Sequence, residues 1–272
     1  MAHIGVIRWL EEHDYQVVSI SGSSMGALVG GIYAAGKLEE FEHWVCAIRA
    51  TDILKLLDLS FGADGMVRGE KIIATLRDLI GDCQIEDLDI PFTAVATDLR
   101  RQREVWLRSG GLFDAIRASI SMPFFFKPAY IDDVMLLDGG ILNPVPIAPT
   151  LGDASDCTIA VNLGGKPDPE FPLPEVEEEE DETDFVTRVA DFLRSLAPSE
   201  SGRDGRYGVI EISDLMFDAM QGAIARQQLA AYPPDIELLV PNNVCGALEF
   251  DRAREMIKAG YELADRRIGA GK

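Results

Sequence analysis

Apolar and polar residues alternate along this chain with two different periods, and the pattern predicts strands followed by helices. Segments with apolar residues on one side and charged residues on the other are typical of amphipathic helices, whereas short, mostly apolar runs indicate buried strands. Helices are predicted at residues 4–13, 25–36, 41–50, 70–80, 112–119, 185–196, 212–231 and 251–266. Strands are predicted at residues 17–20, 92–96, 104–107, 134–137, 157–162 and 236–240.

This alternation of strands and helices indicates an α/β fold. We expect three layers, with a mostly parallel central sheet covered by helices on both faces. No internal repeat and no domain boundary is visible, so the prediction is a single domain over residues 1–272. A proline-rich stretch leads into an acidic run at 175–182, which predicts a surface insertion at about residues 165–184, followed by a C-terminal helical extension.

The formal net charge of −21 argues against two classes of partner. Nucleic-acid binding needs a basic surface, and docking on anionic lipid headgroups needs the same. Much of the excess lies in the acidic run at 175–182, and such runs are usually solvated loops rather than calcium or partner sites. The sequence gives no indication of the oligomeric state.

Hydropathy and cysteine usage predict a cytoplasmic protein. No apolar stretch reaches the roughly 18 residues that span a bilayer, so no transmembrane segment is expected. Charged residues interrupt the first apolar segment, which argues against a signal peptide. The cysteines are scattered, which predicts buried thiols in a reducing compartment rather than disulfides or a zinc site; they are Cys46, Cys83, Cys157 and Cys245.

The candidate nucleophile is Ser24, at the centre of a Gly-x-Ser-x-Gly motif. The motif lies between a predicted strand and a helix rich in small residues, which is the setting of a nucleophile elbow. In such a sharp turn the backbone is strained, and we expect that Gly22 and Gly26 must both lack a Cβ. The helix that begins at Met25 directs its free N–H groups toward any oxyanion that forms beside Ser24.

A serine hydroxyl needs a base, and histidine is poorly placed to supply it. The histidines are His3, His13 and His43, all within the predicted first helices. A Ser-His-Asp triad of the α/β-hydrolase order requires a histidine after the acid. We expect His13 and His43 on the surface, and His3 reaches Ser24 only if the chain start folds back. A triad is therefore disfavoured.

A carboxylate is the better candidate, and Asp138 ends an apolar strand where α/β sites commonly form. Gly139 and Gly140, which follow it, allow close approach of the backbone. A water-poor pocket would raise the pKa of Asp138 toward the working pH. The alternative is that Asp138 only caps a turn.

Other side chains compete with Asp138 for the role of base. Asp98 also ends a buried strand. Lys127 is near Asp138 in sequence, but Pro128 indicates a loop position for it. Asp132 and Asp133 fall in a polar segment that predicts a hairpin turn. Spacing alone does not decide whether Asp138 is the base or only caps a turn.

The order of these motifs resembles that of the patatin-like phospholipases, in particular small bacterial members. The resemblance runs from about residue 2 to about residue 163, and five blocks carry it. These are Gly22-Ser23-Ser24-Met25-Gly26, Ala96-Thr97-Asp98-Leu99, Ala118-Ser119-Ile120-Ser121-Met122-Pro123, Asp138-Gly139-Gly140 and Asn143-Pro144-Val145-Pro146.

The resemblance implies a serine acyl hydrolase that needs neither histidine, metal nor organic cofactor. Ser24 would be the nucleophile and Asp138 the general base of a Ser-Asp dyad, while Asp98 would hold nearby loops. The implied reaction cleaves a carboxylic ester of a phospholipid or lysophospholipid through an acyl-serine intermediate. The apolar stretch at 122–126 either lines an acyl-chain pocket or belongs to the core.

In one respect the sequence departs from the family. Members begin with a strand and a glycine-rich loop that supplies oxyanion donors, and both precede the segment that here starts at Met1. The Met25 N–H would remain as a partial oxyanion hole, and each lost donor typically costs about 10²–10³-fold in turnover. The alternative function is therefore a catalytically weak lipid-binding or regulatory protein. A third hypothesis is a Ser-Lys or triad hydrolase of another fold.

Overall fold

The helices of the computed structural model fall close to those predicted. The structure describes residues 1–48, 52, 69–123, 125–173, 209–245 and 249–271. The α-helices are α1 (Ala2–Glu12), α2 (Met25–Ala34), α3 (Leu38–Ala47), α5 (Glu70–Ile80), α6 (Leu112–Ser119), α8 (Val209–Ala231) and α9 (Ala253–Ile268). Short 3-10 helices are η1 (Ile85–Asp87), η2 (Gly139–Ile141), η3 (Ala148–Thr150), η4 (Phe250–Arg252) and η5 (Gly269–Gly271). The predicted helix at 185–196 and the acidic run at 175–182 lie outside the described residues.

Each predicted strand has a counterpart. The strands are β1 (Ile20–Ser23), β2 (Phe92–Asp98), β3 (Arg103–Leu107), β4 (Ala129–Ile131), β5 (Val134–Asp138), β6 (Ile159–Gly165) and β7 (Ile236–Pro241). The prediction at 17–20 was wrong in position, because the ladder with β2 starts only where Ile20 pairs with Phe92. Strand β4 was not predicted, since three residues carry too little pattern.

The α/β class is confirmed, but the main sheet is mixed rather than mostly parallel. Strand β1 runs parallel to β2, whereas β3 and β5 run antiparallel to β2, and β4 runs antiparallel to β5. A second sheet pairs β6 with β7 in parallel. The prediction failed because short turns join β2 to β3 and β4 to β5, and a short turn forces antiparallel pairing. Asp132 and Asp133, with φ of 48° and 60°, form the predicted hairpin turn.

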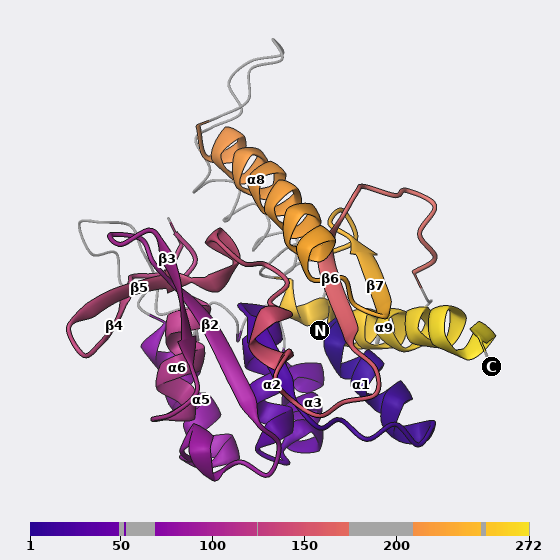
Figure 1. Ribbon diagram of the computed structural model, residues 1–272, viewed down its shortest axis with the longest axis horizontal. Helices are drawn as coiled ribbons and strands as arrows, with labels where there is room; N and C mark the ends of the chain where they lie inside the picture. Colours follow the sequence, from indigo (N-terminus) through magenta and orange to yellow (C-terminus); the bar gives the residue numbers. More distant parts are fainter. Residues whose placement is uncertain (49–51, 53–68, 124, 174–208, 246–248, 272) are drawn as a thin grey trace.

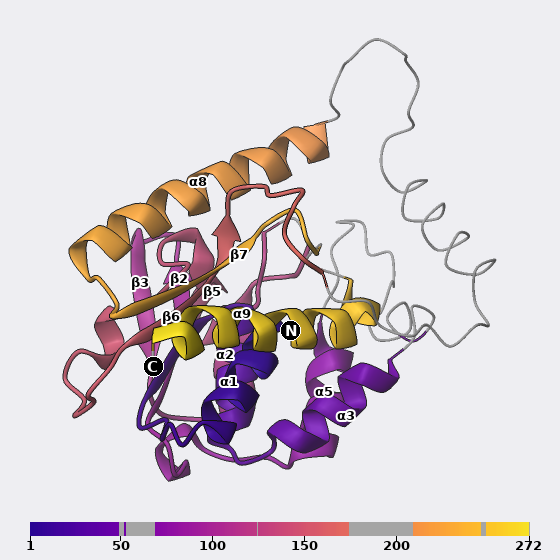
Figure 2. The ribbon, with the colours of Figure 1, turned by 90° about the vertical axis from the view of Figure 1, so that its right-hand side faces the viewer.

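Helices lie on both sides of the sheets, as predicted. Figure 2 shows α8 on one side and α1, α2, α3, α5 and α9 on the other. Helices α2 and α6 pack against β2, and their apolar faces form the largest core together with α3 and α5. A second core joins α1 to α9 and β7. Figure 1 accordingly shows the last helix beside the first.

The register of β2 brings two strand ends together. Strand β3 pairs along one edge of β2 from Ala94 to Asp98, so β1 and β5 must share the other edge. Strand β1 ends with Ser23 opposite Val95, and β5, running the opposite way, ends with Asp138 opposite Ala96. The residues that follow the two strand ends therefore meet at the middle of β2.

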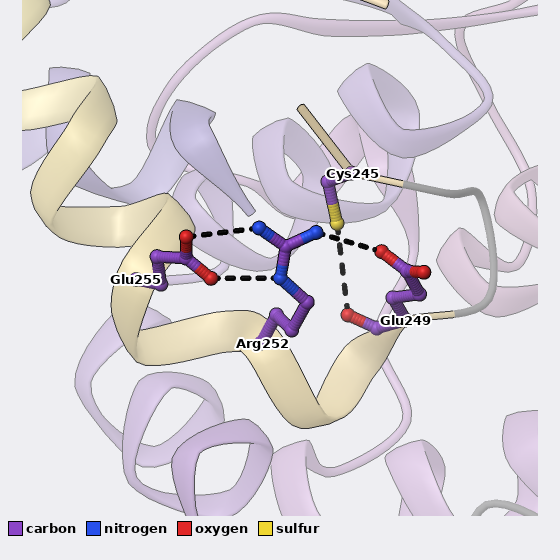
Figure 3. A network of polar contacts seen from close by, with 4 residues as sticks. All are labelled: Cys245, Glu249, Arg252 and Glu255. Atoms are coloured by element: carbon purple, nitrogen blue, oxygen red, sulfur yellow. Dashed lines mark hydrogen bonds and ion pairs between the residues drawn. The ribbon is translucent and has the colours of Figure 1, made fainter. Parts of the chain in front are cut away.

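The four cysteines form no disulfide with one another, and they are less buried than predicted: Cys157 is exposed and the other three are half-buried. Cys245 belongs to a polar network at the start of α9, shown in Figure 3. Its thiol lies 3.7 Å from the carbonyl oxygen of Glu249, and Arg252 binds both Glu249 and Glu255. Burial, with the nearby Glu249 charge, raises the pKa of the Cys245 thiol to about 11, so this thiol is a poor nucleophile at neutral pH.

None of the helices in the described part of the chain combines the length and the apolar character needed to cross a membrane.

Candidate active site

Ser24 occupies a strained turn between β1 and α2. Its φ of 52° and ψ of −120° are rare for a residue with a side chain and cost of order 1–3 kcal/mol. Surrounding contacts maintain this conformation. The Ser24 N–H donates to the hydroxyl of Ser119 at 3.0 Å, and that hydroxyl donates to the carbonyl oxygen of Val95 at 2.6 Å. Hydrogen bonds through Ser119 therefore join the elbow to α6 and β2.

The two motif glycines differ in what a side chain would meet. A Cβ on Gly22 would lie closer than 3.0 Å to the Gly26 carbonyl carbon, which no real Cβ tolerates. Among the described residues, a Cβ on Gly26 would meet only the Nε2 atom of His3, at 3.8 Å, which is ordinary contact. The prediction that both glycines must lack a Cβ is thus supported at Gly22 and wrong at Gly26, because Gly26 faces the space beside His3.

Alanine at these two positions should affect stability in opposite ways. For Gly22→Ala we expect a loss of about 1–3 kcal/mol of unfolding free energy, since the turn must open to accept the methyl group. For Gly26→Ala we expect no loss, and a gain of up to about 1 kcal/mol, because alanine suits a helix better than glycine. Urea unfolding of both variants measures this difference. Equal destabilisation would contradict the tight turn at Gly22.

Asp138 lies at the end of β5 and is buried, with 1% of its surface exposed. Its Oδ1 atom accepts the N–H of Gly140 at 2.7 Å, and its own N–H donates to the carbonyl oxygen of Ser121 at 3.0 Å. Burial raises the pKa of Asp138 from 3.8 to about 6, while the nearby Ser24 hydroxyl and the Gly140 N–H favour the charged form. The Oδ2 atom has no well-formed hydrogen bond within the described residues. A carboxylate in this state can accept a proton from a neighbouring hydroxyl.

Gly139 permits the close approach of the two strand ends. A Cβ on Gly139 would lie closer than 3.0 Å to the carbonyl oxygen of Val95 and to the Ser23 hydroxyl. Gly140 has different neighbours: a Cβ there would collide with the side-chain amide of Gln221, a residue of α8. Asp138 thus both caps the turn, by accepting the Gly140 N–H, and lies beside the Ser24 hydroxyl. The two alternatives for Asp138 do not exclude each other.

Helix α2 starts at Met25, directly after Ser24. Its first N–H groups have no partner within the helix, and no side-chain cap is present at Ser24. The Met25 N–H therefore carries part of the positive charge of the helix N-terminus, beside the Ser24 hydroxyl.

The competing candidates lie elsewhere or have other partners. Asp98 accepts the N–H and the guanidinium of Arg101, at 3.1 and 2.9 Å, which lowers its pKa and holds the β2–β3 turn. Asp132 and Asp133 are exposed in their hairpin. His43 is exposed, as predicted, whereas His13 is half-buried and stacks on Trp9.

His3 lies near the elbow, although the sequence disfavours it as a partner of Ser24. It lines the same cavity as Ser24 and Asp138. Burial lowers the pKa of its imidazole to about 3, so the ring is neutral, and its Nδ1 atom is buried without a partner in the described part of the chain. No hydrogen bond joins His3 to Ser24 or Asp138 among the described residues.

A cavity of about 750 Å³ opens onto Ser24 and Asp138. It continues between the edge of β1 and the edge of β6, which pair within the described residues only with β2 and with β7, respectively. Met122 lines the cavity, whereas Phe126 packs into a small core with Ile48 and Ile72, which favours the core role for this phenylalanine. Phe124 lies outside the described residues.

The model of the family described as Patatin-like phospholipase matches residues 1–151, more than half of the chain. This chain belongs to the patatin-like phospholipase family. The match contains all five blocks that carried the resemblance, among them the elbow, the Ser119 block and the Asp138-Gly139-Gly140 turn. Helix α8, with Gln221, lies outside it.

Its relatives differ in the share of their own length that this chain matches. An uncharacterized NTE family protein of Mycobacterium tuberculosis is 38% identical over 99% of this chain and 88% of its own length. Lysophospholipase nte1 of Emericella nidulans is 31% identical over 60% of this chain and 11% of its length. Neuropathy target esterase sws of Drosophila melanogaster is 30% identical over 61% of this chain and 12% of its length.

Among solved structures, VipD of Legionella pneumophila aligns with a TM-score of 0.42 at 14% identity. The alignment covers 99% of this chain but 64% of VipD, and the likeness is too distant to bear on fold or function.

Sequence reasoning missed Gln221 of α8, which lines the cavity next to Gly140. No motif surrounds it, because its place depends on how α8 packs across the site. Ser119 could have been singled out, since its block was already part of the resemblance.

Proposed function

We propose that this patatin-like protein is a serine hydrolase of carboxylic esters of lipids, with Ser24 as the nucleophile and Asp138 as the general base. One observation carries the proposal: Ser24 occupies a strained elbow next to a buried carboxylate whose pKa is raised to about 6. A raised pKa close to neutral pH is what a catalytic base requires, and such values cluster at functional sites.

In the proposed reaction, Asp138 takes the proton of the Ser24 hydroxyl as the oxygen attacks the ester carbonyl. The negative charge that develops on the carbonyl oxygen is stabilised by the Met25 N–H at the start of α2. The protonated Asp138 then gives its proton to the leaving alcohol, which leaves an acyl-serine. Water, deprotonated by Asp138, attacks this ester and releases the fatty acid, and Ser24 regains its proton.

Lipid esters are the substrate class that we favour, of the phospholipid or lysophospholipid type. Two relatives are named a lysophospholipase and an esterase, although this chain matches only a small part of each. Apolar residues line part of the cavity, including Val17, Ile20 and Leu163. Helix α8, which lines part of the cavity, exposes Leu215, Met216 and Met220 by more than half, and exposed apolar surface of this kind suits contact with lipid.

The alternative, a catalytically weak lipid-binding protein, is favoured by one feature of the site. Among the described residues, the α2 N-terminus is the donor group placed beside Ser24, and a hole with fewer donors lowers turnover. This alternative predicts that the protein binds lipid but hydrolyses no ester above the rate of a Ser24→Ala variant.

The pH dependence of ester hydrolysis tests the proposed function. Because Asp138 acts as a base only when deprotonated, kcat/KM should rise with pH through a midpoint at about 6 and level off above it. An ordinary aspartate would give a midpoint near about 3.9. The measurement is kcat/KM for a lysophospholipid in a series of buffers from acidic to neutral pH. A flat profile across this range would exclude Asp138 as the base.

A further inference from the structure

Helix α8 is fixed to the site by the second half of its length. Ala225 is 2% exposed and packs with Val145, Ile147 and Ala160, and Leu229 adds to the same cluster. The helix also contacts η2, the turn that directly follows Asp138, and β6. Figure 1 shows α8 rising from this anchor point and extending past the sheets.

Gln221 lies one turn before Ala225 and shares its face of the helix. A Cβ added to Gly140 would lie within 3.0 Å of the Gln221 amide nitrogen and 3.1 Å from Oδ1 of Asp138. The Gln221 amide is therefore close to both residues. The Gln221 side chain lines the cavity with Ser24 and Asp138. It makes no hydrogen bond with the described part of the chain, so its two N–H donors and its carbonyl oxygen are available to a ligand.

The position of Gln221 defines which part of an ester it can reach. In the proposed reaction Asp138 returns its proton to the leaving alcohol, so the alcohol oxygen must lie next to Asp138. The carbonyl oxygen lies on the other side, toward Met25 and the start of α2. Gln221, beside Asp138 and Gly140, is therefore on the alcohol side.

We infer that Gln221 is a specificity-determining residue that hydrogen-bonds the leaving alcohol of the substrate. The matching alcohol carries a hydroxyl or phosphate oxygen close to the ester oxygen, as glycerol and its phosphate esters do. This inference rests on the proposed function. It assigns alcohol selection to α8, a helix outside the part of the chain that the family model matches.

Two esters of the same fatty acid test the inference. A monoacylglycerol has a leaving alcohol with hydroxyl groups, whereas the p-nitrophenyl ester has none. Gln221→Met keeps the length of the side chain and removes its hydrogen-bonding groups. We expect kcat/KM for the monoacylglycerol to fall about tenfold in this variant, and kcat/KM for the p-nitrophenyl ester to change by less than about twofold.

Gln227→Met is the matched control, because Gln227 is exposed on the same helix and does not line the cavity. It should leave both rate constants unchanged. An unchanged ratio of the two esters in Gln221→Met, whether both rates hold or both fall together, would overturn the inference and leave Gln221 a packing residue. If the unmodified protein and Ser24→Ala hydrolyse both esters equally slowly, the proposed function itself fails, and the inference falls with it.

Discussion

Replacing Asp138 by Asn should nearly abolish ester hydrolysis. Asparagine keeps the size of the side chain and can still accept the Gly140 N–H, but it cannot take a proton from Ser24. General-base catalysis contributes about 10²–10⁴-fold, so we expect kcat/KM to fall by that factor. The loss should appear with every ester, because both acylation and deacylation need the base.

The same variant should be more stable than the unmodified protein at neutral pH. Asp138 has a folded-state pKa of about 6 against 3.8 ordinarily, so between these values the native protein holds a proton that the unfolded chain releases. The unmodified protein therefore loses stability as pH rises from about 4 to about 6, by roughly 3 kcal/mol in total. The asparagine side chain of the variant cannot ionise, so the stability difference in favour of Asp138→Asn should grow by that amount.

Denaturant unfolding at acidic and mildly alkaline pH, with hydrolysis assays on the same samples, measures both effects. Asp133→Asn is the matched control: it makes the same chemical change in the exposed β4–β5 turn, where asparagine tolerates the positive φ. We expect the control to retain activity and to show no such pH-dependent gain. Full activity in Asp138→Asn would instead support a hydrolase with another base.

Replacing Ser24 by Ala should have the largest effect on turnover. Without the nucleophile no acyl-serine forms, and we expect kcat to fall by about 10⁴-fold or more, leaving what binding and the oxyanion donor still supply. The backbone N–H at position 24 still donates to Ser119, so the fold should be retained. Ser109→Ala, at an exposed site away from the cavity, is the control and should hydrolyse lipid esters at the unmodified rate. Turnover that survives in Ser24→Ala would place the nucleophile elsewhere.

Local patterns predicted the elements well where one face of an element is buried. Helix α5 was predicted with correct ends because Ile73, Leu76 and Ile80 repeat at helical spacing on its buried face. Strand direction was predicted less well. The hairpin turn at Asp132 and Asp133 was recognised, yet its consequence, an antiparallel β4–β5 pair, was not carried into the sheet.

Sequence motifs predicted part of the candidate site. The Gly-x-Ser-x-Gly spacing predicts Ser24 as the nucleophile, and Gly22 is required because a Cβ there would collide with the backbone of the turn. Asp138 was favoured from its place at the end of an apolar strand, and the resemblance then implied its role as base. Its position next to Ser24 could not be predicted, because it depends on the register of β1 and β5 along one edge of β2. Gln221 depends on the packing of α8, which no local pattern encodes.

The most direct test of the dyad is intact-mass analysis after treatment with a fluorophosphonate, which reacts covalently with activated serines. We expect the protein to gain the mass of a single adduct, and the Ser24→Ala variant to gain none. Labelling should also be much slower in Asp138→Asn. A folded protein that stays unlabelled, or an adduct that persists in Ser24→Ala, would contradict the account of Ser24 as a nucleophile activated by Asp138.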